Sequence, residues 1–282
     1  METALQIEDL NVALSTFQLK NITLKLPCGM VMGLIGRNGA GKTTLIKSML
    51  NLYERSGTVC FYGRSLEKDH EQVCLDIAYV GTDLDYAPNS RIKKIKNLYQ
   101  SFYSDFDETR FQTLCEASGF DEKTRLSALS LGQSKLFQLY LAICRKPKML
   151  ILDEPMANLD PITRRDIVEL LRSFMMEEDH AVLISSHLLS DLEKIADDIV
   201  LIDRGEIILH DDMVQLQEGY FEVFGTKEEI TQLKGSVCRS MKRGNEIQAL
   251  CHVQEERELA HLQHRHADLE TIMYYLCERR EG

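Results

Sequence analysis

A glycine-rich run, GRNGAGKTT at residues 36–44, most constrains how this chain folds. It follows the apolar run at 31–35 and leads into the apolar-periodic segment 43–52, an order that predicts a strand, a tight loop and a helix. Glycines at 36, 39 and 41 let successive backbone N–H groups converge, and the helix adds the positive end of its dipole. The run fits the phosphate-loop pattern Gly-x-x-x-x-Gly-Lys-Thr, in which Lys42 contacts the β- and γ-phosphates and the Thr43 hydroxyl ligates Mg²⁺. We therefore expect a nucleoside triphosphate site formed by Gly36, Arg37, Asn38, Gly39, Ala40, Gly41, Lys42, Thr43 and Thr44.

A second motif, MLILDEP at 149–155, places two carboxylates after a run of apolar residues. Ligands of open α/β sheets bind outside the carboxyl ends of the strands, so these side chains are expected to face the phosphate loop. Asp153 is predicted to hold Mg²⁺ through water. Glu154 is predicted to polarise the attacking water, as a general base or a water orienter.

The remaining pattern predicts strands alternating with helices. Strands are expected near 5–12, 17–26, 56–62, 77–80, 181–185, 199–202 and 207–209, and helices near 43–52, 88–118, 136–144, 162–178 and 188–196. This alternation indicates an α/β fold with a mostly parallel sheet covered on both faces. Composition changes after about residue 219, where we expect a small accessory part with short strands and a His- and Glu-rich helical ending.

Charge and composition exclude several classes of protein. The net charge of −11 argues against a nonspecific grip on nucleic acid. No stretch reaches ~18 consecutive apolar residues, and the N-terminus lacks the pattern of a secretory signal, so a cytoplasmic location is expected. The eight scattered cysteines include no Cys-x-x-Cys pair and are predicted to be reduced thiols.

Three further motifs give the chain a family resemblance. LSLGQ at 129–133 resembles the LSGGQ signature of ABC ATPases, Asn158-Leu159-Asp160 resembles their D-loop, and Ser185-Ser186-His187 resembles the end of the switch strand with its histidine. Together with the phosphate loop (Walker A) and the LDEP run (Walker B), they follow the order of that family. The resemblance covers about residues 1–218.

The resemblance implies a composite site and a set of partners. Ser130 and Gly132 would contact the γ-phosphate bound to the opposite protomer, Asp160 would reach across the dimer, and His187 would hydrogen-bond the γ-phosphate. It also implies ATP and Mg²⁺ as ligands, a second ABC subunit in a homodimer or heterodimer, and integral membrane permease subunits. The chain would then lie at the inner face of the cell membrane, without nucleic-acid partners.

Two positions depart from the family pattern. The aromatic residue that usually stacks on adenine would fall near Ala13 or Leu14, so Phe17 is the nearest candidate, with a core phenylalanine as the alternative. The Q-loop glutamine is replaced in YVGTDLDY at 79–86, where Thr82 stands in its place. Asp83 is the predicted substitute as a Mg²⁺ and water contact, with a solvated turn residue as the alternative.

The resemblance implies a P-loop NTPase (RecA-like) α/β core with an N-terminal antiparallel β subdomain and a helical signature subdomain near 86–135. Residues 1–218 would form the ATP-binding domain and 219–282 a small α+β appendage. The function that fits best is ATP hydrolysis powering transport, with the motif form resembling subunits of bacterial exporters. The alternatives are a soluble ABC ATPase acting as a mechanical clamp, and a catalytically inactive partner in a heterodimer. Residues 91–103 (RIKKIKNLYQSFY) form either a basic solvated face or the surface that meets a membrane subunit.

Overall fold

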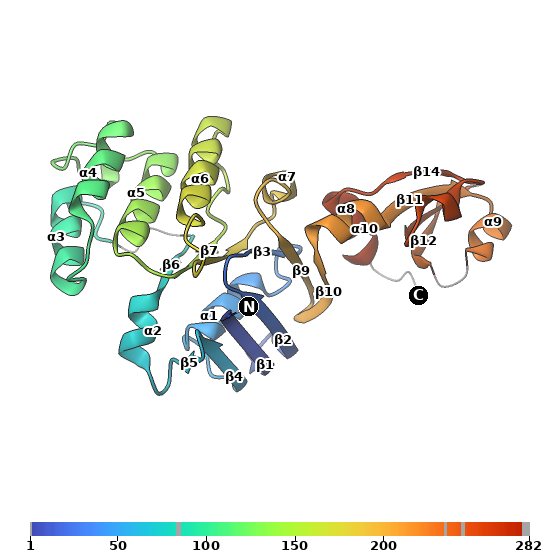
Figure 1. Ribbon diagram of the computed structural model, residues 1–282, viewed down its shortest axis with the longest axis horizontal. Helices are drawn as coiled ribbons and strands as arrows, with labels where there is room; N and C mark the ends of the chain where they lie inside the picture. Colours follow the sequence, from blue (N-terminus) through green and yellow to red (C-terminus); the bar gives the residue numbers. More distant parts are fainter. Residues whose placement is uncertain (1, 83–85, 234–235, 244–245, 278–282) are drawn as a thin grey trace.

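The computed structural model describes residues 2–82, 86–233, 236–243 and 246–277 (Figure 1). Its centre is a six-stranded sheet in the order β10-β9-β3-β8-β7-β6. The strands are β3 (Val31–Ile35), β6 (Ile77–Val80), β7 (Met149–Asp153), β8 (Ala181–Ser185), β9 (Asp198–Asp203) and β10 (Glu206–Asp212). All neighbours pair in parallel except β9 and β10, which form an antiparallel hairpin. The predicted parallel α/β sheet is confirmed.

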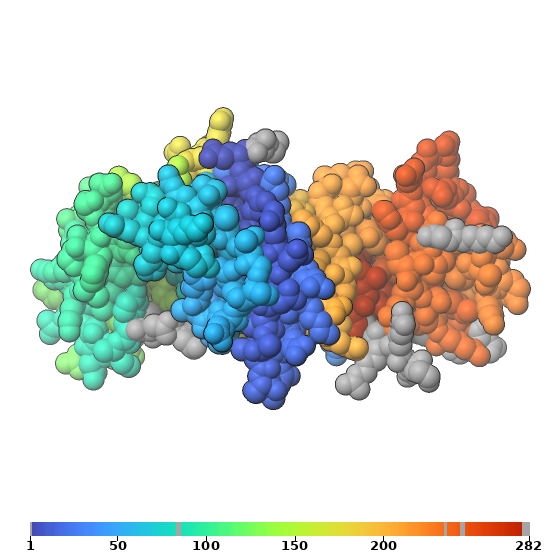
Figure 2. All heavy atoms as spheres, turned by 90° about the horizontal axis from the view of Figure 1, so that it is seen from below, coloured from blue at the N-terminus to red at the C-terminus, as the bar shows by residue number. Residues whose placement is uncertain are grey.

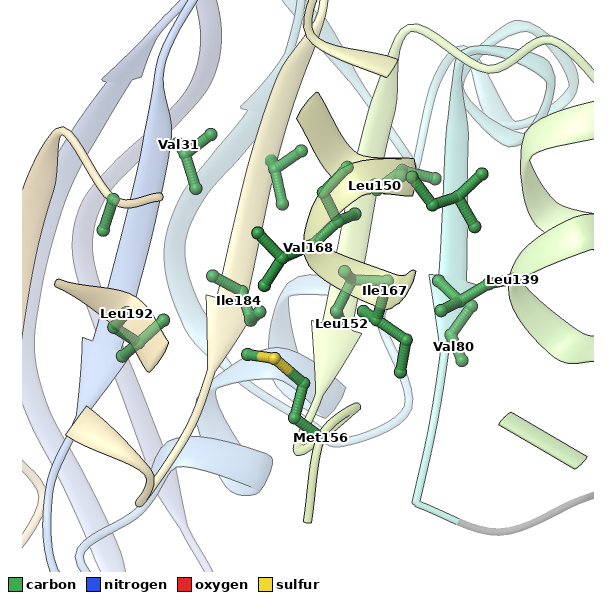
Figure 3. Close-up of a cluster of buried hydrophobic side chains, with 14 of the residues drawn as sticks. Val31, Val80, Leu139, Leu150, Leu152, Met156, Ile167, Val168, Ile184 and Leu192 are labelled. Carbon is green, nitrogen blue, oxygen red and sulfur yellow. The ribbon is translucent and has the colours of Figure 1, made fainter. Parts of the chain in front are cut away.

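The central strands are short apolar runs because both sheet faces are covered. Every residue of β3, β7 and β8 is buried. Side chains alternate between the faces, so Leu150 and Leu152 join a cluster with α5 (Leu131–Cys144) and α6 (Pro161–Phe174), shown in part in Figure 3. Ile151 joins the cluster on the other face, with α1 (Lys42–Met49) and the N-terminal sheet. The sheet therefore lies between a helical layer and a second sheet.

That second sheet is antiparallel, in the order β2-β1-β4-β5. Its strands are β1 (Thr3–Ala13), β2 (Gln18–Pro27), β4 (Ser56–Phe61) and β5 (Arg64–Ser65). Alternating side chains of β1 and β2 are buried against α1, which accounts for the period-two pattern of the sequence. The short helix α2 (His70–Asp76) follows and was not predicted from the sequence.

The helical part contains α3 (Ile92–Phe102), α4 (Glu108–Ala117), a 3₁₀ turn at Leu126–Ala128 and α5 (Figure 1). The expected helix over 88–118 is in fact two helices, because the chain turns between Tyr103 and Asp107, the N-cap of α4. Lys96 of α3 points inward and makes 2.7 Å ion pairs with Glu108 and Glu122. These pairs join α3 to both ends of the segment containing α4.

The C-terminal residues form a third sheet, β12-β13-β11-β14, flanked by short helices. Its elements are α8 (Met213–Gly219), β11 (Tyr220–Gly225), α9 (Lys227–Gln232), β12 (Val237–Arg243), β13 (Glu246–His252), a 3₁₀ turn at Glu256–Leu259, β14 (Gln263–His266) and α10 (Leu269–Cys277). The expected helical ending is α10, but the His-rich run HLQHRH at 261–266 just before it is not helical, since most of that run is β14. His264 and His266 contact the ring of Phe221 on the neighbouring strand, which accounts for the extended conformation. Within the described residues no group of three His, Cys, Asp or Glu side chains is placed to hold a metal ion.

The predicted boundary at residues 218/219 falls at the end of α8, but the apolar core crosses it. Ile272 and Tyr275 of α10 share one buried cluster with Leu189 and Leu192 of α7 (Leu189–Leu192). Figure 2 shows the helical part, the N-terminal sheet and the C-terminal residues in a row, in contact with one another. None of the described helices is long and apolar enough to cross a bilayer.

Truncation after Gly219 is therefore expected to destabilise the remainder. It uncovers Leu192 and Leu216, which are almost fully buried. Uncovering several such side chains costs about 1.5–3 kcal/mol each, so we expect the midpoint of thermal unfolding to fall by more than about 5 °C, or the fragment to aggregate. Calorimetry of the truncated and full-length chains measures this. A monomeric fragment that unfolds at the full-length temperature would contradict the shared core.

Candidate nucleotide site

The loop at residues 36–41 connects β3 to α1 and depends on glycines whose backbone φ is positive. Gly36 (φ +153°) and Gly41 (φ +118°) have backbone conformations that other residues rarely adopt. A Cβ atom on Gly36 would lie 2.3 Å from the carbonyl oxygen of Ile202. These glycines let the loop curl against β9 and enter α1 with its N–H groups unobstructed.

Lys42, the first residue of α1, points back into this loop. Its ammonium donates to the Gly36 carbonyl at 2.7 Å and lies 3.6 Å from Oε1 of Glu154. The side chain is only 7% exposed, so its charge acts where water screens it little. A buried ammonium that bonds to loop carbonyls, in a loop whose N–H groups converge, suits a polyphosphate anion.

Thr43 and Asp153 come together at the carboxyl edge of the sheet, as predicted. The Thr43 hydroxyl donates to Oδ2 of Asp153 at 2.8 Å, although the two residues are 110 positions apart in the chain. A hydroxyl and a carboxylate are hard oxygen donors of the kind that Mg²⁺ takes from proteins next to phosphate. The donor set therefore fits a magnesium ion.

Glu154 follows β7 in a left-handed conformation, with φ +51°. Non-glycine residues occur there rarely, and such strain is concentrated at functional sites. From this turn Oε2 of Glu154 lies 2.6 Å from Nδ1 of His187 and also accepts the His187 backbone N–H. The His187 side chain remains 45% exposed. The two predicted catalytic side chains are thus in direct contact beside Lys42.

The signature and D-loop residues lie at the starts of two adjacent helices. Ser130 caps α5 in a capping box with Gln133, and Asp160 caps α6, accepting the N–H groups of Ile162 and Thr163. The Thr163 hydroxyl and these N–H groups lower the pKa of Asp160 below its usual value. A Cβ on Gly132 would lie 3.1 Å from the Thr163 side chain, so the two helix starts pack closely. Among the described residues, Ser130 and Asp160 bond to the starts of their own helices and Gly132 packs against Thr163 of α6, and none of the three is bonded to the phosphate loop.

Comparison with known proteins decides the family. The model of the family described as "ABC transporter" matches residues 19–157. ABC transporter ATP-binding protein YtrB of Bacillus subtilis (strain 168) is 30% identical over 206 residues, which cover 73% of this chain and 70% of that protein. The chain belongs to the ABC transporter ATP-binding proteins.

Other members of this family and a solved structure agree. Lantibiotic transport ATP-binding protein SrtF of Streptococcus pyogenes is 33% identical over 203 residues, covering 68% of this chain and 82% of that protein. Bacitracin transport ATP-binding protein BcrA of Enterococcus faecalis is 30% identical over 212 residues, covering 74% and 69%. An ATP-binding subunit of an ABC transporter superposes with a TM-score of 0.70 at 23% identity, covering 76% of this chain and 92% of that one. The ABC ATPase fold is confirmed, and this family binds and hydrolyses ATP.

The two departures from the ABC pattern have different outcomes. Phe17, which is half-buried, lies against the phosphate loop, since a Cβ on Gly41 would be 2.7 Å from its Cζ. It also packs on the cluster beneath α1, so both of its interpretations stay open. Asp83 lies outside the described residues. The backbone just before it is held by the signature helix, because the buried Lys135 ammonium donates to the carbonyls of Gly81 and Thr82 at 2.5 and 2.6 Å.

One polar residue of the site was not identified from the sequence. Ser185, the last residue of β8, is fully buried and bonds both to Asp153 and to the backbone of Glu154. The Ser-Ser-His run marks this strand end, but the resemblance assigns a role only to its histidine. A second contact that the sequence does not predict joins Arg37 of the phosphate loop to the carbonyl of Cys277 at the end of α10, at 3.5 Å.

Proposed function

We propose that this chain binds MgATP and hydrolyses it to power transport through separate membrane subunits. The observation that supports this best is the continuous set of contacts Thr43–Asp153 and Lys42–Glu154–His187 at one edge of the sheet. These five side chains come from three separate segments, and together they supply a cation, hard oxygen donors, a candidate base and an imidazole. P-loop ATPases require this combination for phosphoryl transfer to water.

In the proposed reaction the phosphates of ATP bind the loop N–H groups and the Lys42 ammonium. Mg²⁺, held by Thr43 and by Asp153 through water, supplies positive charge at the β- and γ-phosphates. Glu154 accepts a hydrogen bond from the attacking water and takes its proton as the water oxygen bonds to the γ-phosphorus. The bond to the bridging oxygen breaks and yields ADP and phosphate. His187, 2.6 Å from Glu154, orients that carboxylate in the proposed reaction and would hydrogen-bond the γ-phosphate.

We further propose that a second ABC subunit completes the site. The start of α5 is exposed, with Leu131 52% accessible to solvent, and it presents helix N–H groups and the Ser130 hydroxyl that an anion would bind. An exposed apolar side chain beside an anion-binding helix start is suited to an interface. In this arrangement Ser130 and Gly132 contact the γ-phosphate bound by the partner, and Asp160 holds α6 beside them.

Docking on integral membrane permease subunits is proposed for the helical part. Arg91, Lys93 and Lys94 line an open concavity of about 590 Å³ together with Ala87, Asn89, Ser90 and Asn97. The start of the basic segment therefore lines a shallow hollow that is open to solvent. The names of SrtF and BcrA refer to transport of a lantibiotic and of bacitracin, which supports export of similar amphiphiles by this chain at the inner face of the cell membrane.

Charge reversal at this concavity tests the transport assignment against the soluble clamp. The unaltered chain is expected to copurify from detergent-solubilised host membranes with an integral membrane protein of several spans, and Lys93→Glu/Lys94→Glu is expected to lose this copurification. ATP turnover of the isolated double variant should stay within about twofold, because surface charges outside the site contribute little to catalysis. Lys20→Glu, at an exposed ion pair with Glu206, is the control. Recovery of the unaltered chain with ribosomes or DNA instead would favour the clamp.

A further inference from the structure

We propose that Ser185 is a positioning residue that aligns both Walker B carboxylates, Asp153 and Glu154, through a single hydroxyl group. The inference rests on the proposed function, since it assigns Ser185 a part in the hydrolysis at this site. Ser185 ends β8 and lies directly opposite Asp153 in the parallel pairing of β7 and β8. Both side chains are fully buried, so water does not substitute for the contacts between them.

The hydroxyl of Ser185 uses both of its hydrogen-bonding roles here. It donates its single proton to Oδ1 of Asp153 at 2.6 Å and accepts the backbone N–H of Glu154 at 3.0 Å. Oδ2 of Asp153 is thereby left to Thr43, which donates to it at 2.8 Å. One carboxylate oxygen is fixed by Ser185 and the other faces Thr43, the residue that would hold Mg²⁺ together with Asp153. Without the Ser185 proton, the Asp153 carboxylate is free to rotate away from Thr43.

The second contact of Ser185 supports the strained turn at Glu154. That residue has φ +51°, and its N–H is anchored by the hydroxyl and also by the carbonyl of Ser185 at 3.2 Å. In this conformation Oε2 of Glu154 reaches Nδ1 of His187 at 2.6 Å. The chain runs from Ser185 at the end of β8 directly to His187. This strand end therefore positions both Glu154 and His187. Ser185 thus acts through Asp153 and Glu154 and does not itself need to touch ATP.

The test compares Ser185→Ala, Ser185→Thr and Ser185→Cys in the full-length chain. ATP turnover is measured at saturating ATP over a Mg²⁺ titration, and ATP affinity is measured separately in EDTA. We expect Ser185→Ala to raise the half-saturating Mg²⁺ concentration and to lower kcat, each about tenfold, because a hydrogen bond to a charged group is lost. Affinity for Mg²⁺-free ATP should be unchanged. Ser185→Thr, which keeps the hydroxyl, should remain within about threefold of the unaltered chain.

The controls separate positioning from loss of stability. Ser118→Ala removes a hydroxyl that lies 2.5 Å from that of Tyr140, between α4 and α5, and should leave both kinetic values unchanged. A purely structural Ser185 would instead lower the unfolding temperature and the Mg²⁺-free affinity together. If the alanine variant does not fold, the cysteine variant decides, because a thiol is a weaker donor and should shift both values in the same direction.

Normal Mg²⁺ dependence and kcat in a folded Ser185→Ala or Ser185→Cys chain would overturn the inference. A threonine variant that unfolds at the normal temperature but is as impaired as alanine would also overturn it. Absence of Mg²⁺-dependent hydrolysis in the unaltered chain would refute the proposed function instead. In that case Mg²⁺-dependent ATP binding of the same variants still tests the alignment of Asp153.

Discussion

Glu154→Gln is expected to lower kcat for ATP hydrolysis by about 10²–10⁴-fold while MgATP binding stays within about threefold. Glutamine keeps the shape of the side chain and its contact with His187 but cannot take a proton from water. Lys42 loses a charged neighbour 3.6 Å away, which favours binding of anionic phosphates slightly. Steady-state phosphate release and calorimetric titration with MgATP measure the two quantities.

Glu169→Gln is the matched control for this variant. Glu169 lies on α6 in an exposed ion pair with Arg172, so its substitution should leave kcat unchanged. If Glu154→Gln retains more than about a tenth of the normal kcat, Glu154 is not the base or water orienter of the reaction.

Lys42→Ala is expected to weaken ATP binding by at least about 100-fold, with hydrolysis lost as a consequence. The ammonium is buried and is held within the phosphate loop by the Gly36 carbonyl, so no surface cation takes its place. Calorimetric titration with ATP gives the affinity directly. The thermal unfolding midpoint shows whether the loop retains its fold.

The control for this variant is Lys47→Ala, in the last turn of the same helix. Its ammonium is separated from the phosphate loop by more than a helical turn, and ATP affinity should change less than about threefold. Equal affinities for Lys42→Ala and the unaltered chain would refute the phosphate-loop assignment.

The fold was largely predictable because its strands are either fully buried or half-buried. Runs such as 149–152 and 181–184 are apolar throughout, and segments such as 5–12 alternate, so the sequence alone locates them. The helix expected over 188–196 is only the four-residue α7, which is followed by turns at 193–195. The helix expected over 136–144 begins earlier, at Leu131, where the capping box of Ser130 starts it. Such shifts depend on caps and tertiary contacts, which hydrophobic periodicity does not encode.

The site was predictable where chemistry depends on motif spacing. Lys42, Thr43, Asp153, Glu154 and His187 all lie at the carboxyl edge of the sheet, because parallel strands end at the same edge. The contribution of Ser185 depends on the register of β7 against β8, which the sequence does not reveal. The contact of Arg37 with the end of α10 joins residues 240 positions apart, and no local pattern predicts it.

We propose that the phosphate loop is half of a site that a second subunit completes. Light scattering of purified Glu154→Gln with and without MgATP shows whether two copies of the chain form that site. We expect the mass to change from that of one chain, 32.3 kDa, to about twice that value when ATP is added. The Ser130→Arg/Glu154→Gln double variant should keep the mass of one chain when ATP is added. A Glu154→Gln chain that binds MgATP yet remains monomeric at concentrations well above its ATP affinity would contradict a composite site formed by two copies of this chain.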